Sequence, residues 1–501
     1  MPVFPLPLVG QPNQRGFSIT DITAQDQLYR GVIFQAVPNP LTKSADVYVQ
    51  KRLGLYRAKA PEPSASVASA CFNSPSFAGS FFSAFTSASS GTASQIYQVT
   101  TGLGAVSADH VVFHINETVL SSGTTNFLFT AQNVASSSQG WYSAGGGAGS
   151  LTQITDAQFP SDVVGQPQEM GGYVFWMTRS GRVYNSDLDS VTSYTAAAYF
   201  PCDSITDDGV GLARLGDQLF SFGNNSIEIL VNAGNPAPGS PLKRIKTISI
   251  GASSSGIGFG RALITASRDR LAWLDSGFLN LYVYSGGTID KIPTSGVFGT
   301  ISTSAGIRSI SFITIFAQDF IHISRQVSGS YLTMNLFYSL DTGMWCDPNF
   351  ATGCMIFDEA CYNDRATGIV GVSSTNTNGD VYAIDPTNAT WQDDDPGGGG
   401  TNFSVVLQTS RFDLGTNKRK FIKSASLVAD RQTSGTVTIE YSDDDYGRWE
   451  THPDTFDLTN LSKKLFRLGS HKNGRAYRLT YTGNTGFRAQ RLDIEYEIGA
   501  N

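Results

Sequence analysis

The stretch YSDDDYGRWE, Tyr441 to Glu450, holds the densest group of side chains in this sequence that could do chemistry. Four of its ten residues are acidic, and a glycine and a tryptophan stand among them. Paired carboxylates cleave glycosidic bonds by acid and base catalysis, and clustered carboxylate oxygens bind calcium. Asp and Gly are also the residues that tight turns favour. The stretch is therefore either a reactive loop or a hairpin turn.

A comparison with a known motif favours the turn. Ser442, Asp444 and Trp449 resemble the Asp-box of sialidase-type propellers, Ser-x-Asp-x-Gly-x-x-Trp. The glycine comes one position late, at Gly447, with Tyr446 in its place, and the pattern occurs once. We expect a hairpin turn in which the three aspartates are solvated. Gly447 then adopts the unusual backbone angle and Trp449 packs into the core.

Other acidic residues offer a second route to glycan hydrolysis. Carboxylates are available in the middle of the chain at Asp187, Asp189, Asp207, Asp208 and Glu228. A sialidase-like site would also need repeated Asp-boxes and three arginines that can be identified as a triad. The chain has no GxSxG, HExxH, Walker-type loop or strand-linked GxGxxG motif. We predict no enzyme activity, catalytic residue or cofactor, and keep a glycan-binding or glycan-degrading tail protein as the alternative.

Metal and redox sites are not indicated. His110 and His114 share one face of a strand-like segment, but a third ligand is not evident, so we expect a structural pair. Three consecutive aspartates, 393–395, lack the spacing of a calcium loop. The five cysteines form no CxxC pair, which favours reduced, buried thiols made in a cytoplasm. We predict no bound metal.

Composition sets the fold class. The chain of 501 residues has 52 glycines, 11% aromatic and only 15% charged residues, which favours many short strands joined by tight turns. The net charge of −7 and the pI near 5.3 argue against a nucleic-acid-binding protein. No apolar run is long enough to span a membrane, and the first residues lack the features of a secretory signal. The prediction is an all-β protein.

A hairpin pattern recurs in the middle of the chain. Each unit has an apolar run, a glycine-containing turn and a second run that carries an aromatic residue. Six turn glycines lie 41, 42, 54, 52 and 50 residues apart: Gly140, Gly181, Gly223, Gly277, Gly329 and Gly379. About 40–50 residues is the period of a four-stranded propeller blade. We predict a β-propeller of about six blades, with two β-sandwiches in series as the alternative.

The chain divides into four parts on this interpretation. Residues 1–65 form an extended N-terminal arm with a few strands, and residues 66–392 form the propeller. The stretch at 393–401, DDDPGGGGT, is an Asp/Gly-rich linker. Residues 402–501 alternate apolar and polar positions, as in Leu492, Ile494, Tyr496 and Ile498, and form a C-terminal β-sandwich.

Several stretches resemble one protein family. They are VIFQAVPNPLTKSADVYVQKRLGLYR (Val32–Arg57), LARLGDQLFSFGNNSIEIL with Ile227 and Glu228, FYSLDTGMW, RFDLGTNKRKFIKSASLVADRQTSGTVTIEYSDDDYGRWE and RLGSHKNGRAYRLTYTG. Together they are similar to the packaged-DNA stabilisation, or tail-nozzle, proteins of short-tailed bacteriophages. Leu53 stands where the family has a proline.

The resemblance implies a structural virion protein of the tail. In that family, copies form a ring, usually a hexamer, below the portal and its adaptor. The ring extends the DNA channel and retains packaged DNA until ejection. Implied partners are other copies, the adaptor or portal ring, tail needle, fibre or tailspike proteins, and passing double-stranded DNA without sequence-specific binding. An acidic lining would let the phosphate backbone slide past.

Two groups of residues are candidates for contacts with the adaptor or a neighbouring subunit. The N-terminal arm offers Tyr29, Arg30, Tyr48 and Arg52. The sandwich offers Arg411, Lys418, Arg419, Arg467 and Arg478, which could meet an acidic face. The alternatives are an ordinary edge strand for the first group and simple solvated charges for the second.

Overall fold

The chain is all-β, as predicted. The computed structural model describes residues 2–499 except 9–27, 39–44, 60–65, 74–80, 88–94, 99–100, 108, 134–136, 146–149, 235–238, 255–261, 278–279, 294–306, 316–317, 327–332, 349–358, 363–368, 373–380, 385–390, 395–399, 415, 445 and 473. Every regular element of these residues is a β-strand. They contain no helix long and apolar enough to cross a membrane.

Seven antiparallel sheets of four strands each make up most of the described residues from 56 to 346 and from 359 to 384. In chain order the strands are β5 (Tyr56–Lys59), β6 (Ser66–Asn73), β7 (Phe81–Ser87), β8 (Gln95–Gln98), β9 (Thr101–Ala105), β10 (His110–Val119), β11 (Thr125–Asn133), β12 (Ser138–Ala144), β13 (Thr152–Gln153), β14 (Val163–Met170), β15 (Tyr173–Thr178), β16 (Arg182–Asn185), β17 (Tyr199–Pro201), β18 (Gly209–Leu215), β19 (Gln218–Gly223), β20 (Ile227–Asn232), β21 (Leu242–Ile248), β22 (Ile264–Ala266), β23 (Arg270–Leu274), β24 (Asn280–Ser285), β25 (Thr288–Pro293), β26 (Ile307–Ile315), β27 (Gln318–Gln326), β28 (Thr333–Ser339), β29 (Trp345–Cys346), β30 (Glu359–Tyr362), β31 (Ile369–Val372) and β32 (Val381–Ile384).

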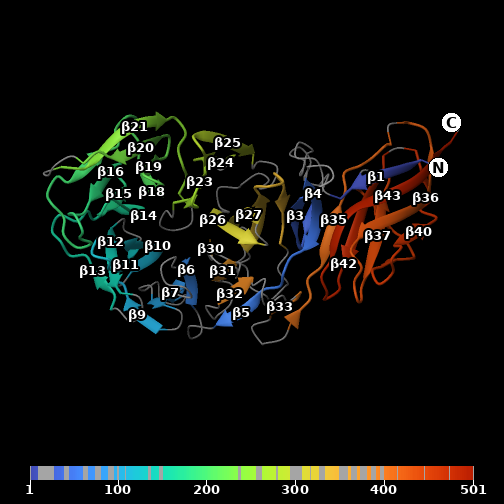
Figure 1. Cartoon of the computed structure of the whole chain (residues 1–501), viewed down its shortest axis with the longest axis horizontal. Helices are drawn as coiled ribbons and strands as arrows, with labels where there is room; N and C mark the ends of the chain where they lie inside the picture. Colours follow the sequence, from blue (N-terminus) through green and yellow to red (C-terminus); the bar gives the residue numbers. More distant parts are fainter. Residues whose placement is uncertain are drawn as a thin grey trace.

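The seven sheets are arranged like the blades of a propeller. Their first strands contact one another in a closed cycle, β6, β10, β14, β18, β22, β26, β30 and back to β6. Figure 1 shows the sheets around a common centre. The last sheet takes its fourth strand from far away in the sequence, because β5 pairs with β32. We call this part of the molecule the ring lobe.

Stacking explains why the strands of the ring lobe are so apolar. A sheet with neighbours on both sides buries both faces, so its inner strands lose the simple alternation of half-buried strands. Along β11, every residue except the last is buried. Aromatic rings fill the space between sheets: Phe82 of β7 lies 4.1 Å from Phe127 of β11, and Phe222 of β19 lies 5.6 Å from Trp273 of β23, between ring centroids.

The described residues hold seven four-stranded sheets, one more than the six units that the turn glycines predict. Each of the six predicted hairpins falls in a different sheet, from β10–β13 to β30–β32. The additional sheet is β6–β9. Its strands come from the Ser/Ala-rich stretch around 66–105, where many small residues hide the alternation of apolar and polar positions.

Small residues let neighbouring inner strands of the ring lobe approach closely. An ideal Cβ on Gly165 of β14 would lie only 2.4 Å from Cα of Gly211 in β18, and one on Gly211 would lie 2.9 Å from Cβ of Ala262. The Ala262 N–H also lies 3.4 Å from Nε2 of His114 in β10, which accepts its hydrogen bond. Backbones of separate sheets thus meet closely at this point.

The C-terminal part contains two further sheets. One has the order β3–β4–β43–β36–β40, with β1 on β43 and β41 on β36; the other has the order β2–β35–β42–β37–β38, with β39 on β37. Their strands are β1 (Val3–Pro7), β2 (Leu28–Arg30), β3 (Val32–Pro38), β4 (Ala45–Lys51), β35 (Val405–Gln408), β36 (Lys420–Ala429), β37 (Thr436–Ser442), β38 (Glu450–Thr451), β39 (Phe456–Asp457), β40 (Lys464–Phe466), β41 (Ser470–His471), β42 (Ala476–Tyr481) and β43 (Arg488–Ile498). We call them together the C-terminal lobe.

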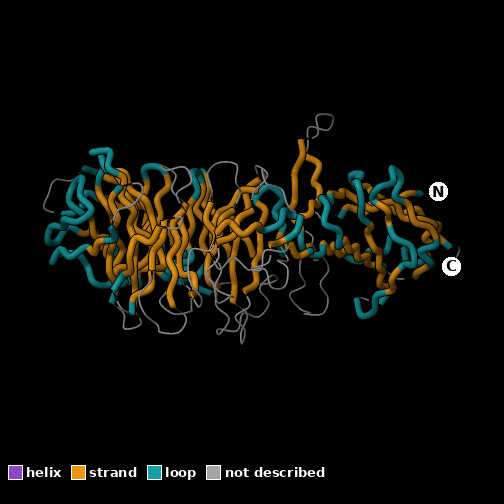
Figure 2. The backbone as a smooth tube through the Cα atoms, turned by 90° about the horizontal axis from the view of Figure 1, so that it is seen from below, coloured by secondary structure: helices purple, strands orange, loops and turns teal. Residues whose placement is uncertain are grey.

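The first strands of the chain belong to this lobe. We expected an extended N-terminal arm with a few strands. In the structure, β1 pairs with β43, β2 with β35, and the β3–β4 hairpin with β43. Leu6, Val32 and Phe34 are fully buried in its core. The described strands of residues 1–65 are therefore parts of sheets: β1 to β4 complete the two C-terminal sheets, and β5 completes a sheet of the ring lobe. Both termini lie together at the far end of an elongated molecule (Figure 2).

A buried ion pair lies between the two segments of the chain that connect the lobes. Arg52 donates to both carboxylate oxygens of Asp393, at 2.7 and 2.5 Å, and neither side chain is exposed. Asp393 also accepts the Leu55 N–H at 2.9 Å. We expected Asp393 to belong to an Asp/Gly-rich linker. Instead, β33 (Asp393–Asp394) pairs with β34 (Gly400–Thr401), and this pairing holds the Asp393 carboxylate in position. We call the region between the two lobes the joint.

Candidate assembly interface

The acidic stretch at Tyr441–Glu450 is a turn between β37 and β38, as predicted, but two of its details were wrong. The residue with a positive φ is Tyr446, at 71°, and not Gly447. The Ser442 hydroxyl explains this geometry, because it accepts the Tyr446 N–H at 3.1 Å and donates to Asp444 at 2.8 Å. Asp444 also accepts the Arg448 N–H at 2.8 Å, and these two hydrogen bonds lower its pKa.

Trp449 lies on the surface of the sheet and not in the core. Its ring is half-buried, and the Arg478 guanidinium carbon stacks 3.8 Å above it. Asp443 is also less free than expected, because it pairs with the buried Arg475 at 2.6 and 2.7 Å. The stretch is thus a structural turn whose side chains hold two cations, Arg475 through Asp443 and Arg478 through Trp449. Its described carboxylates do not face one another across a common site.

The carboxylates of the ring lobe are engaged in holding loops together. Asp207 accepts the backbone N–H groups of residues 224, 225 and 226, at 2.6 to 3.0 Å. Glu228 is buried, accepts the Ser204 N–H at 2.9 Å and pairs with Arg244 at 3.0 Å. Asp187 accepts the hydroxyl groups of Ser193 and Thr195. These contacts give the three side chains a role in the scaffold.

His110 and His114 do not share one face of the strand as expected, because a β-bulge between Val112 and His114 shifts the register of β10. His110 and His114 are 6% and 8% exposed on β10, and the described residues hold no group of three or more potential metal ligands. Cys71, Cys202 and Cys346 form no disulfide within the part of the chain that the structure describes. Burial raises the pKa of Cys202 to about 12, which keeps this thiol protonated. The side chains of Cys354 and Cys361 lie outside the described residues.

Two of the four N-terminal candidates cannot reach a partner. Tyr29 is 3% exposed and Arg52 is not exposed at all, so both are corrected to internal residues of this chain. Arg30 reaches the surface, where it pairs with Asp347 at 3.1 Å. Tyr48 is half-buried on β4, with the Arg488 guanidinium carbon 5.0 Å above its ring. Spacing in the sequence could not distinguish the buried arginine from the exposed one.

The C-terminal candidates all lie at or near the surface, but they do not form one group. Lys418, Arg419 and Arg467 are exposed around the start of β36, where Arg419 donates to the Ser470 hydroxyl at 3.1 Å and the Arg467 N–H donates to the Lys423 carbonyl at 3.1 Å. Arg411 is exposed, and its Nε donates to the Gly474 carbonyl. Arg478 is half-buried on the other sheet, bonded to Gln408.

Sequence reasoning missed the apolar side chains beside these cations. In the register of the β36 sheet, Phe421 lies opposite Glu497, Ser424 lies opposite both Glu495 and Phe466, and Glu495 lies opposite Val3. Directly opposed residues share one face of a sheet. This face therefore displays Val3, Phe421 and Phe466, which are 57%, 41% and 59% exposed. The signal available in the sequence was the adjacent apolar pair Phe421 and Ile422, because neighbouring residues of a strand point to opposite faces of its sheet.

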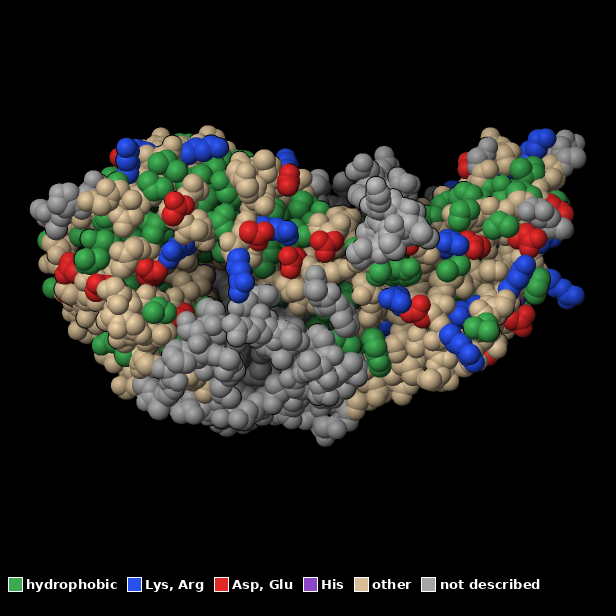
Figure 3. Space-filling view, viewed as in Figure 1, with side chains coloured by type: hydrophobic (Ala, Val, Ile, Leu, Met, Phe, Trp, Pro, Cys, Tyr) green, Lys and Arg blue, Asp and Glu red, His purple; other side chains and the backbone are tan. Residues whose placement is uncertain are grey.

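The ion pairs on this face leave an excess of positive charge. Lys423 pairs with Glu497 at 2.8 Å, and Lys464 pairs with Glu495 at 3.1 Å. Hydrogen bonds from Ser424 and Lys464 lower the pKa of Glu495. Among the described residues, Lys418, Arg419, Arg467 and Lys472 lie within ion-pair distance of no carboxylate. The basic apolar patch is defined here as Val3, Phe421, Phe466, Lys418, Arg419, Lys423, Lys464, Arg467 and Lys472. Figure 3 shows basic and hydrophobic side chains side by side on this lobe.

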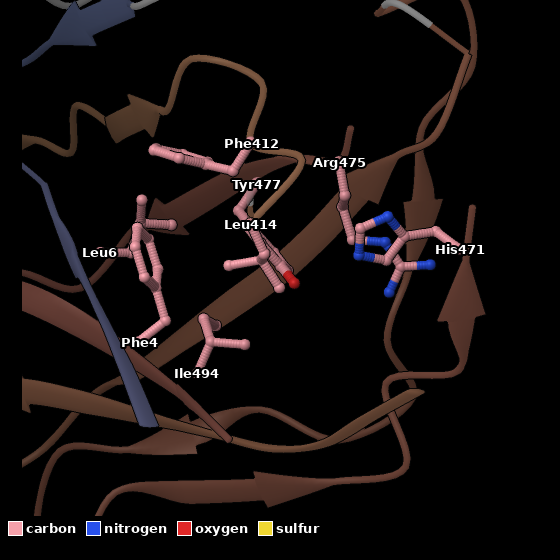
Figure 4. A pocket seen from close by; sticks show the side chains of 8 residues that line it. All are labelled: Phe4, Leu6, Phe412, Leu414, His471, Arg475, Tyr477 and Ile494. Atoms are coloured by element: carbon pink, nitrogen blue, oxygen red, sulfur yellow. The ribbon is translucent and has the colours of Figure 1, made fainter. Parts of the chain in front are cut away.

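A small pocket lies between the two C-terminal sheets. Figure 4 shows its lining: Phe4, Leu6, Phe412, Leu414, His471, Arg475, Tyr477 and Ile494. The walls are mostly apolar, and the guanidinium at one end is already engaged by Asp443. Burial raises the pKa of Tyr477 to about 12, which keeps its phenol neutral. The pocket is a gap in the core next to β1. The exposed apolar and basic side chains of the lobe lie instead on the basic apolar patch.

Comparisons with known proteins identify no family. No family profile and no curated protein matches the chain. Among solved structures, the crystal structure of BBS1N in complex with ARL6DN, soaked with lead, is 10% identical with a TM-score of 0.40; the match covers 68% of this chain and 99% of that chain. The computationally designed Ika8 protein is 8% identical with a TM-score of 0.37, covering 66% of this chain and 99% of that chain. Similarities this low carry no argument about function.

Proposed function

We propose that the chain is a structural virion protein, a tail nozzle or hub subunit of a short-tailed bacteriophage. Copies of it assemble into a ring, expected to be a hexamer, below the portal and adaptor. The ring extends the DNA channel and retains packaged DNA until ejection. The sequence resemblance in five separate stretches supports this proposal. On this interpretation the seven sheets are the blades of a propeller and the two C-terminal sheets form a sandwich.

The observation that carries the proposal is which side chains are engaged inside the chain and which are displayed on its surface. The candidate carboxylates Asp187, Asp207 and Glu228 hold loops together, whereas aromatic and basic side chains are displayed on an open sheet face. Exposed apolar residues rimmed by charge are typical of protein–protein contact surfaces. A subunit whose main task is to contact other proteins would have such a distribution.

The packing of the inner strands of the ring lobe fits a channel formed between copies. Gly165, Gly211 and Ala262 hold neighbouring inner strands of the ring lobe in close contact, so we place the DNA channel between copies and not within one chain. In the proposed ring, DNA moves along the axis shared by all copies. The net charge of −7 favours this, because an acidic wall repels phosphate and prevents tight binding.

The other expected partners follow from the same proposal. They are the adaptor or portal ring and tail needle, fibre or tailspike proteins, with no membrane involved. The protein is made in the cytoplasm of the bacterial host and acts in the virion tail. The basic apolar patch and Arg30 are the described surfaces that these partners, or other copies, could contact.

DNA retention tests the proposed function directly. Heads are filled with DNA in a phage that lacks this protein, and leakage is measured with and without the purified chain. We expect the chain to stop the leakage and to form a ring below the connector in electron micrographs. Heads that retain their DNA without the chain would contradict the proposal. Binding or cleavage of cell-surface glycan by the isolated chain would then become the property to measure.

A variant pair makes this experiment sharper. Phe466→Ser removes an aromatic side chain from the basic apolar patch, and Ile245→Ser removes an apolar side chain of similar exposure, 51%, from β21 in the ring lobe. We expect Phe466→Ser to weaken retention and Ile245→Ser to retain DNA like the wild type. Equal retention by both variants would remove the patch from the proposal.

A further inference from the structure

We propose that each copy carries two complementary surfaces, and that the basic apolar patch of one copy binds an acidic surface on the ring lobe of the next. The acidic turn face is defined as Glu117, Val119, Glu169, Asp187, Leu188, Asp189 and Asp217. The inference rests on the proposed function in one respect, that copies associate with one another. It adds which surfaces meet and that the contact is head to tail.

The distribution of exposed apolar residues is the first observation. Among the described residues, eight large apolar side chains are highly exposed. Five of them belong to the β36 sheet or adjoin it: Val3, Phe421, Leu461, Phe466 and Ile498. Two more, Val119 at 46% and Leu188 at 59%, lie in neighbouring turns of the ring lobe. Only Ile245 stands outside these two groups.

Contacts between turns make the acidic turn face one continuous surface. The Ser121 N–H, two residues after Val119, donates to Asp189 at 3.1 Å. Leu188 lies over the β14–β15 turn, because an ideal Cβ on Gly172 would be 3.0 Å from its Cδ1. From there Glu169 pairs with Arg214 at 2.7 Å, and Arg214 donates to the Gly216 carbonyl at 2.8 Å, next to Asp217.

Charge distinguishes the two surfaces. Residues 402–501 contain 15 Lys and Arg and 12 Asp and Glu, a net charge of +3, which leaves 20 and 30, or −10, for the rest of the chain. On the acidic turn face, the nearby cation Arg214 is engaged by Glu169. On the basic apolar patch, four cations have no paired carboxylate among the described residues. An apolar centre with opposite charge around it is the complementarity that selects a partner.

The positions of the two surfaces determine the kind of assembly. In Figure 1, β10, β16 and β18 lie in one half of the long molecule, and β36 and β40 lie at the opposite end. Two distant surfaces that complement each other cannot meet within one rigid chain. They meet between copies, and a repeated head-to-tail contact of this kind closes into a ring or continues as a filament. A two-fold dimer would instead bring the same surface together with itself.

Charge reversal with mixing tests the inference. The patch variant is Lys418→Glu with Lys472→Glu, and the turn-face variant is Leu188→Lys with Asp217→Lys. A matched control, Ile245→Lys with Asp290→Lys, makes similar changes at exposed sites outside both surfaces. Self-association is measured by sedimentation velocity at low and physiological salt. Each test variant alone should associate at least about tenfold more weakly than the wild type, and the control should not change.

Mixing the two test variants gives the decisive measurement. One copy then offers a normal turn face to a normal patch, and the reversed surfaces also have opposite charges, so association should recover in the mixture. Normal assembly of either variant, or no recovery on mixing, would overturn the inference. A wild type that stays monomeric even at low salt would overturn it too. The proposed function has its own readout, because copies that assemble through other surfaces would still stop DNA leakage.

Discussion

The charged residues at the joint between the lobes should be costly to alter. Arg52 and Asp393 are both fully buried, and each is the charge partner of the other. Loss of one partner leaves an uncompensated charge in a low-dielectric site. We expect Arg52→Met to lower the free energy of unfolding by about 3–5 kcal/mol, measured by urea denaturation.

A double variant separates charge from shape in this prediction. Arg52→Met combined with Asp393→Leu removes both charges, so it should be more stable than Arg52→Met alone, although the Leu55 N–H then loses its acceptor. A single variant within about 1 kcal/mol of the wild type would contradict the buried ion pair. Arg30→Met, at the exposed pair with Asp347, is the control and should have little effect.

Lys51 makes the same joint sensitive to pH. Burial, and then the charge of Arg52, lower its pKa from 10.5 to about 8, while Asp393 acts in the opposite direction. Between about pH 8 and 10.5 the unfolded chain keeps this proton and the folded chain loses it. The unfolded state therefore binds more protons, and the contribution of Lys51 to stability rises with pH in this window.

Comparison with Lys51→Met isolates this effect from other titrating groups. The free energy of unfolding of the wild type minus that of the variant should increase from pH 8 to 10.5 and stay level between pH 6 and 7. Urea denaturation at each pH gives both values. A difference that is constant or falls with pH would contradict a lowered pKa. Lys51 also donates to the Gly483 carbonyl at 2.6 Å, so the variant need not be more stable at any pH.

At the scale of elements, the close approach of β14 and β18 depends on glycine. Gly165 has a φ of +70°, and an ideal Cβ would lie 2.4 Å from the Gly211 backbone. Gly165→Ala combines a left-handed conformation with a clash that no side-chain rotation relieves. It should lower the free energy of unfolding by about 3 kcal/mol or more.

Gly286 is the matched control for this substitution. Its φ is +56°, and a Cβ there would meet nothing within 4 Å. Gly286→Ala should therefore cost only the conformational term, about 1–2 kcal/mol in urea denaturation. Equal costs for the two alanine variants would mean that the sheets can separate at the centre of the ring lobe.

The elements that the sequence predicts well are those whose partners are close in the chain. Each of the six hairpins carries its own turn and its own apolar runs, so local pattern is sufficient. The β6–β9 sheet was not predicted, because its many small residues weaken the alternation of apolar and polar positions. The pairing of β5 with β32 and of β1 with β43 joins strands hundreds of residues apart, and no local signal encodes such contacts.

Some residues of the candidate interface could likewise be predicted from local sequence, and others could not. Exposed cations such as Lys418 and Arg419 could be identified from their position before a strand. Burial of Arg52 could not, because its partner Asp393 lies 341 residues away in a stretch that has the composition of a linker. The acidic turn face joins turns of separate sheets, so only the fold brings Val119 and Leu188 together.

At the scale of the whole molecule, one core crosses the joint between the lobes. A single cluster of buried apolar residues includes Ile313, Phe320 and Phe337 of the ring lobe together with Val32, Phe34 and Val405 of the C-terminal lobe. Strands from the start of the chain complete sheets in both lobes. Neither lobe can unfold without exposing apolar surface and unpaired strand edges of the other.

This continuity predicts that the two lobes unfold together. Although a chain of 501 residues would ordinarily unfold domain by domain, scanning calorimetry of the monomeric chain should show one transition, with calorimetric and van't Hoff enthalpies that agree. Arg52→Met should weaken the joint and split or broaden this transition, whereas Gly286→Ala should shift it without a change in shape. Two separate transitions in the wild type would mean that the lobes are independent. A rigid joint is also what the head-to-tail contact needs, because a fixed angle between the patch and the turn face determines how many copies close a ring.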